Sequence, residues 1–82
     1  MKTGSLILVD DDRQILDSMA GWLREQGHHV DTASSVGQCI AKLGERNYDL
    51  VLADVCLRDE DGMQILEHCA DNHPHTSVVM IS

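Results

Sequence analysis

The sequence lacks the features that mark membrane proteins and nucleic-acid-binding proteins. It has no run of about 18 apolar residues, so we expect no membrane span. A signal-peptide pattern is also lacking before the first predicted strand, and we expect a cytoplasmic location. Lys and Arg number 6 against 14 Asp and Glu, which gives a formal net charge of −8. This excess of negative charge argues against direct contact with nucleic acid or anionic lipid, and it fits a cation or a basic patch on another protein.

Neither a disulfide framework nor a zinc site is indicated. The 3 cysteines, Cys39, Cys56 and Cys69, are odd in number and show no Cys-x-x-Cys spacing, and the 5 histidines form no ligand pattern. Internal repeats, linkers and low-complexity segments are lacking as well. At 82 residues the chain is therefore predicted to be one domain, residues 1–82, with reduced thiols.

Two short apolar runs each end in acidic residues. Residues 6–9 lead into Asp10, Asp11 and Asp12, and residues 50–53 lead into Asp54. Both runs are too short for helices and are typical of buried strands. If the two strands are parallel neighbours, four carboxylates meet at one edge of the sheet.

Strand and helix patterns alternate along the chain. Helical spacing predicts a first helix over about residues 13–26, a second that starts after Ser34 or Ser35, and a third that starts after Asp61 and ends before Pro74. Apolar and polar residues alternate over residues 29–33, which is typical of an edge strand. Residues 56–60 are predicted to form a polar loop, and residues 77–82 another buried strand. The residues expected to face the core from the helices are Ile15, Met19, Trp22, Leu23, Val36, Cys39, Ile40, Leu43, Ile65, Leu66 and Cys69.

This alternation predicts an α/β fold with a doubly wound parallel sheet, right-handed crossovers and helices on both faces. In such sheets ligands bind beyond the carboxyl ends of the strands, where the strand order reverses. For an order that begins 2-1-3, that point lies between the first and third strands. These are the two strands that end in acids.

The predicted cluster of carboxylates favours a hard divalent cation. Taken singly, each aspartate would more often be a helix cap or a loop residue. Clustered carboxylates repel one another, however, and Mg²⁺ prefers oxygen ligands and keeps several waters. Such an ion would shield Asp54 from the negative charge of an approaching phosphoryl group, and the Asp54 carboxylate would then act as a nucleophile to form an aspartyl-phosphate.

From residue 6 to residue 82 the sequence resembles the receiver domain of two-component response regulators. The matching segments are residues 7–12, residues 48–54, Asp61-Gly62 and residues 78–82. The resemblance implies a flavodoxin-like sheet with the order 2-1-3-4. It also implies a nitrogen-regulator type of response regulator with a downstream output, namely transcription.

The resemblance also implies roles for individual residues. Asp54 would take a phosphoryl group from a sensor histidine kinase in the presence of Mg²⁺. The metal ligands would be Asp10, Asp11, Asp54 and the backbone carbonyl of Cys56. Ser82 would be the switch residue whose hydroxyl bonds the phosphate.

The chain departs from the family pattern at two places. Leu57-Arg58-Asp59 stands where relatives usually have Met-Pro-Gly, so we expect altered rates of phosphorylation or hydrolysis. The family's fifth strand, with its lysine, and the last two helices have no counterpart in the sequence, which is expected to be the amino-terminal part of a receiver. Residues 78–81 would then form a bare apolar edge, and we expect a homodimer through that strand or segment exchange.

Two other functional classes remain open at this point. One is a magnesium-dependent phosphatase with an aspartyl-phosphate intermediate, but such enzymes usually carry a second acid where this chain has Cys56. The other is a flavin-binding module, which would need a phosphate-cradling loop after the first strand. Three aspartates at that place would repel a phosphate.

Overall fold

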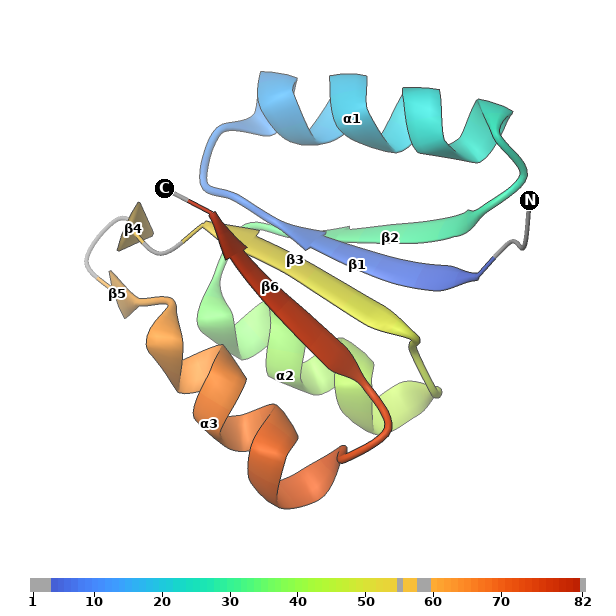
Figure 1. Cartoon of the computed structure of the whole chain (residues 1–82). Helices are drawn as coiled ribbons and strands as arrows, with labels where there is room; N and C mark the ends of the chain where they lie inside the picture. Colours follow the sequence, from blue (N-terminus) through green and yellow to red (C-terminus); the bar gives the residue numbers. More distant parts are fainter. Residues whose placement is uncertain (1–3, 55, 58–59, 82) are drawn as a thin grey trace.

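The chain folds into a parallel sheet with helices on both faces (Figure 1). A computed structural model describes residues 4–54, 56–57 and 60–81. Among them, no helix combines the length and the apolar character that a membrane span requires. The elements in chain order are β1 (Ser5–Val9), α1 (Arg13–Glu25), β2 (His29–Ala33), α2 (Val36–Glu45), β3 (Leu50–Asp54), β4 (Cys56–Leu57), β5 (Glu60–Asp61), α3 (Met63–Asn72) and β6 (Ser77–Ile81).

The strand order confirms the prediction. The main sheet is 4-stranded with the order β2-β1-β3-β6, all neighbours are parallel, and β6 is the fourth long strand of the expected 2-1-3-4 order. Val9 of β1 pairs with Ala33 of β2 on one side and with Ala53 of β3 on the other. The residues that follow Val9 and Ala53 therefore emerge at the same edge of the sheet.

Side chains of alternate strand residues belong to two separate hydrophobic clusters, one on each face of the sheet. One face of the sheet packs against α1, and the opposite face packs against α2 and α3 (Figure 1). The smaller cluster consists of Leu6, Leu8, Leu16, Ala20 and Val30. The larger one consists of Ile7, Val9, Ala33, Val36, Cys39, Leu43, Tyr48, Val51, Ala53, Leu57, Ile65 and Cys69.

The prediction of which face of α1 is buried is wrong, because the observed buried face is rotated about the helix axis relative to the predicted one. Ile15 is 45% exposed and Trp22 is 61% exposed, whereas Leu16 and Ala20 are buried. The buried stripe therefore starts at Leu16 and recurs at helical spacing, with Met19 and Leu23 partly buried beside it. On α3, the predicted core residue Leu66 also lies at the surface, at 36% exposure.

The last strand is not buried as predicted. Val78 and Met80 of β6 pack against the larger cluster, but Val79 and Ile81 point to the opposite face and are 45% and 41% exposed. Helix α1 lies over β1 and β2 on that face (Figure 1), and no other described element covers β6 there.

Residues 56–60 were predicted to be a polar loop, and this is also corrected. Strands β4 and β5 pair antiparallel, with Cys56 opposite Asp61 and Leu57 opposite Glu60. Leu57 is 5% exposed within the larger cluster. Burial of this apolar side chain holds the short hairpin, β4 paired with β5, against the core.

Candidate functional site

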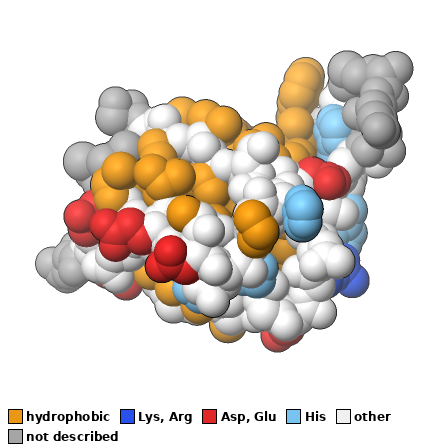
Figure 2. All heavy atoms as spheres, turned by 60° about the horizontal axis from the view of Figure 1, so that its bottom comes forward, with side chains coloured by type: hydrophobic (Ala, Val, Ile, Leu, Met, Phe, Trp, Pro, Cys, Tyr) orange, Lys and Arg blue, Asp and Glu red, His pale blue; other side chains and the backbone are white. Residues whose placement is uncertain are grey.

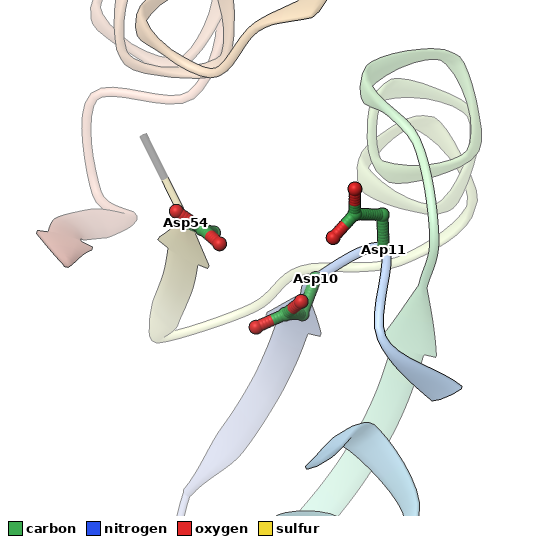
Figure 3. A group of neighbouring side chains, drawn as sticks. All are labelled: Asp10, Asp11 and Asp54. Carbon is green, nitrogen blue, oxygen red and sulfur yellow. The ribbon is translucent and has the colours of Figure 1, made fainter. Parts of the chain in front are cut away.

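Three of the four carboxylates predicted to converge do meet where β1 and β3 end. Asp10 and Asp11 follow β1, and Asp54 is the last residue of β3 (Figure 3). Each offers a carboxylate oxygen, and these oxygens all lie within 4.8 Å of one another. Asp10 and Asp54 are half-buried, and Asp11 is exposed.

Asp10 is oriented by two backbone hydrogen bonds. Its own N–H donates to the carbonyl of Ala33 at 3.2 Å, which extends the pairing of β1 with β2 by one step. Its Oδ1 accepts from the N–H of Asp12 at 2.9 Å. These two bonds hold Asp10 at the end of the sheet and orient its carboxylate before any ligand binds.

Asp12 does not join the cluster, so the expectation of four converging carboxylates is corrected to three. Oδ1 of Asp12 accepts from the N–H groups of Gln14 and Ile15, at 3.0 and 3.4 Å, and caps the start of α1. Local hydrogen bonding to two otherwise unpaired helix amides decides its direction.

The surface near the cluster is negatively charged. Several acidic side chains gather at one end of the molecule, and most of the histidines in this view lie toward its other end (Figure 2). Three hard oxygen ligands, one of them on an exposed residue, match the donor preference of Mg²⁺ and leave room for the waters that this ion retains. The residues present therefore fit a magnesium ion.

A second polar cluster was not predicted. The hydroxyl of Tyr48 donates to Oδ2 of Asp31, and Nε2 of His29 lies 3.2 Å from the same oxygen. Burial raises the pKa of Tyr48, and the bond to Asp31 raises it further. His29 and Asp31 stand two residues apart on one face of an edge strand, which sequence alternation could have shown, but the contact with Tyr48 spans 17 residues and left no local signal.

Some of the predicted site lies outside the described residues. This holds for Ser82, for Arg58 and Asp59, and for the side chain of Cys56. The backbone of Cys56 begins β4, 2 residues after Asp54.

The fold and the site define the class of protein. A parallel sheet with the order β2-β1-β3-β6 and a polar site at the ends of β1 and β3 is a flavodoxin-like arrangement with its ligand position at the point where strand order reverses. The sequence matches the family described as "Response regulator receiver domain" over residues 6–82. The chain belongs to this family, the receiver domains of two-component response regulators.

Similar proteins and structures agree with this membership. The alginate biosynthesis transcriptional regulatory protein AlgB of Pseudomonas aeruginosa is 33% identical over 81 residues, which are 99% of this chain and 18% of that protein. The crystal structure of NtrX from Brucella abortus has 34% identity and a TM-score of 0.90, and the match covers 99% of this chain and 18% of that one. The solution structure of the beryllofluoride-activated NtrC4 receiver domain dimer has 29% identity and a TM-score of 0.85, and the match covers 93% of this chain and 63% of that one. The chain thus spans under a fifth of the length of the first two proteins.

Proposed function

We propose that Asp54 is the phosphoacceptor of a signalling switch. The observation that supports this proposal is the meeting of one oxygen each from Asp10, Asp11 and Asp54 within 4.8 Å, at the carboxyl ends of β1 and β3. A carboxylate oxygen of Asp54 attacks the phosphorus of a phosphohistidine on a sensor kinase. The bond from phosphorus to the histidine nitrogen breaks as the bond to Asp54 forms, and the histidine leaves in its neutral form after taking a proton.

Asp10, Asp11, Asp54 and the backbone carbonyl of Cys56 would hold Mg²⁺. The ion, when bound, neutralises charge on the transferring oxygens. Asp10 contributes a carboxylate already oriented by the Asp12 N–H, so little side-chain freedom is lost on binding. The chain acts as a signalling domain and not as an enzyme that turns over a small substrate.

We further propose that residues 1–82 serve as the receiver domain of a cytoplasmic transcriptional regulator. The relative AlgB supports this, since it is described as a transcriptional regulatory protein and 99% of this chain aligns with it. The hydroxyl of Ser82 would hydrogen-bond the phosphate. The protein that donates the phosphoryl group would be a sensor histidine kinase. The buried free thiols of Cys39 and Cys69 suit a reducing compartment.

Phosphorylation is tested by labelling the chain with acetyl phosphate, with and without Mg²⁺, and by beryllofluoride binding. We expect Mg²⁺-dependent labelling that Asp54→Asn abolishes. Asp12→Asn is the matched control, because asparagine caps helices as well as aspartate does and Asp12 is not one of the three clustered carboxylates. Labelling that survives Asp54→Asn would exclude Asp54 as the acceptor.

The alternative of a magnesium-dependent phosphatase gains no support. Neither the family nor the relatives described above are phosphatases by name, and position 56 holds no acid. Steady hydrolysis of a generic phosphate ester with Mg²⁺ would revive it.

We also propose that two copies associate through β6. The outer edge of β6 has no partner strand among the described residues, and Val79 and Ile81 are exposed beside it. On the same face, Ser18, Met19, Trp22, Leu23 and Leu52 line a cavity of about 320 Å³. Unpaired strand edges next to apolar surface favour strand pairing between chains.

Sedimentation velocity over a range of concentrations tests this association. We expect dimers at high concentration and fewer of them in Val79→Lys, because a lysine on an edge strand opposes pairing. Lys at the exposed helical position Ile15 is the control for added charge. A strictly monomeric wild-type chain at high concentration would refute the proposal.

A further inference from the structure

The segment that follows Asp54 is tied to a helix from a distant part of the sequence. Oε1 of Glu60 accepts a hydrogen bond from the backbone N–H of Val36 at 3.1 Å. Glu60 belongs to β5, and Val36 is the first residue of α2, 24 residues earlier. The bond therefore joins two elements that meet only through tertiary structure.

The start of α2 favours a carboxylate at this position. Oγ of Ser35 accepts from the N–H of Gln38, and Oε1 of Gln38 accepts from the N–H of Ser34. These local bonds leave the first helical N–H, that of Val36, for another acceptor. A negative charge beside the amino end of a helix also interacts favourably with the helix dipole. Glu60 supplies both the acceptor and the charge.

The bond restrains the backbone next to the acidic cluster. Glu60 pairs with Leu57 across the short hairpin, and Leu57 directly follows Cys56. Leu57 is buried in the larger cluster, and Asp61 at the end of the hairpin bonds the N–H of Met63 at the start of α3. The hairpin is thus anchored to the core, to α3 and, through Glu60, to α2. Leu57 shares the larger cluster with side chains of α2, and Glu60 adds a hydrogen bond to the backbone of that helix.

We propose that Glu60 is a positioning residue for the metal site. By bonding Val36, it holds the hairpin against α2 and so fixes the backbone of Cys56, whose carbonyl we assigned to Mg²⁺. This inference rests on the proposed function, because it concerns the same metal site. Glu60 does not itself touch the cluster, and its charge is directed to the helix.

The test compares Glu60→Ala with Glu60→Gln in the full chain by titration calorimetry with Mg²⁺ alone. Both variants lose the same negative charge, but only glutamine keeps an oxygen that can accept from Val36. Loss of an outer partner of a metal ligand weakens metal binding by about 10–100-fold, and we expect about tenfold weaker binding for Glu60→Ala because Glu60 acts through the backbone. Glu60→Gln should bind within about twofold of the wild type, since the acceptor is retained.

A stability control separates positioning from a merely structural role. Ser35→Ala removes the local cap of α2 and should lower Tm, as Glu60→Ala does, but it should leave Mg²⁺ affinity unchanged. Equal Mg²⁺ affinity in Glu60→Ala and the wild type would overturn the inference, and so would equal weakening in both Glu60 variants, which would show an effect of charge alone. If the wild type itself binds no Mg²⁺ and is not labelled, the proposed function fails first, and the two failures are thereby distinguished.

Discussion

The hydrogen bond from Tyr48 to Asp31 gives a direct test of how the edge strand β2 is held. Tyr48→Phe removes only the hydroxyl and leaves the ring, which is 4% exposed, packed in the larger cluster. A hydrogen bond to a charged group contributes about 1.5–3 kcal/mol. Because the Asp31 side chain is 28% exposed, water replaces part of the lost donor, and we expect a loss of about 1 kcal/mol in the free energy of unfolding.

Urea unfolding at pH 7, followed by far-UV circular dichroism, measures this loss. Fluorescence is a poor probe here because Trp22 is already 61% exposed in the folded chain. In a thermal melt, a loss of this size lowers Tm by about 4–8 °C for a domain of this length. The same substitution in an Asp31→Ala background should cost almost nothing. An equal cost in that background would refute the role of the pair.

The loss should also depend on pH. Burial alone raises the pKa of Asp31, but the hydrogen bonds from Tyr48 and His29 outweigh it and leave the pKa below its ordinary value. A carboxyl group with a lowered folded-state pKa stabilises the fold above its unfolded-state pKa, and this stabilisation disappears as the pH falls through the folded-state pKa. The cost of Tyr48→Phe should therefore be full at pH 7 and shrink below about pH 3.9. A cost that does not change with pH would contradict this assignment.

Three further predictions concern packing and backbone conformation. Ile7→Ala, at a residue that is 0% exposed, should cost about 2–5 kcal/mol in urea unfolding, while the same change at Ile15, 45% exposed, should cost little. Gly27 has a φ of 95°, so Gly27→Ala should lower the free energy of unfolding by about 1–2 kcal/mol. Gly21 lies inside α1, where an added Cβ meets no atom within 4 Å, so Gly21→Ala should raise the free energy of unfolding by about 0.5–1 kcal/mol. Burial raises the pKa of the Cys39 thiol to about 12. A chain with Cys39 as its only cysteine should therefore react with a thiol reagent at pH 8 only after unfolding.

The strands and the core of the site could be predicted because their signals are local. The apolar runs of β1 and β3 are bounded by acids, and parallel strands bring their carboxyl ends to one edge, so Asp10, Asp11 and Asp54 had to be neighbours once the order was right. The cap formed by Asp12 likewise depends only on amides 2 and 3 residues away.

The errors arose where neighbouring elements, rather than local pattern, decide the outcome. Ile15 and Trp22 lie at helical spacing with the true core residues, and only the docking of α1 on β1 and β2 shows which rotation is used. Val79 belongs to an apolar run that looks buried, yet its exposure depends on whether another element covers that face. The hairpin after Asp54 depends on burial of Leu57 under helices that the local sequence does not specify.

The sequence by itself determined which segments become strands and helices, the family, and the three acids at the sheet edge, because hydrophobic periodicity and helix capping act over a few residues. The tertiary structure alone decided the contacts between distant segments. The bond from Val36 to Glu60 and the bond from Tyr48 to Asp31 span 24 and 17 residues, and each forms only after packing has brought its two partners together.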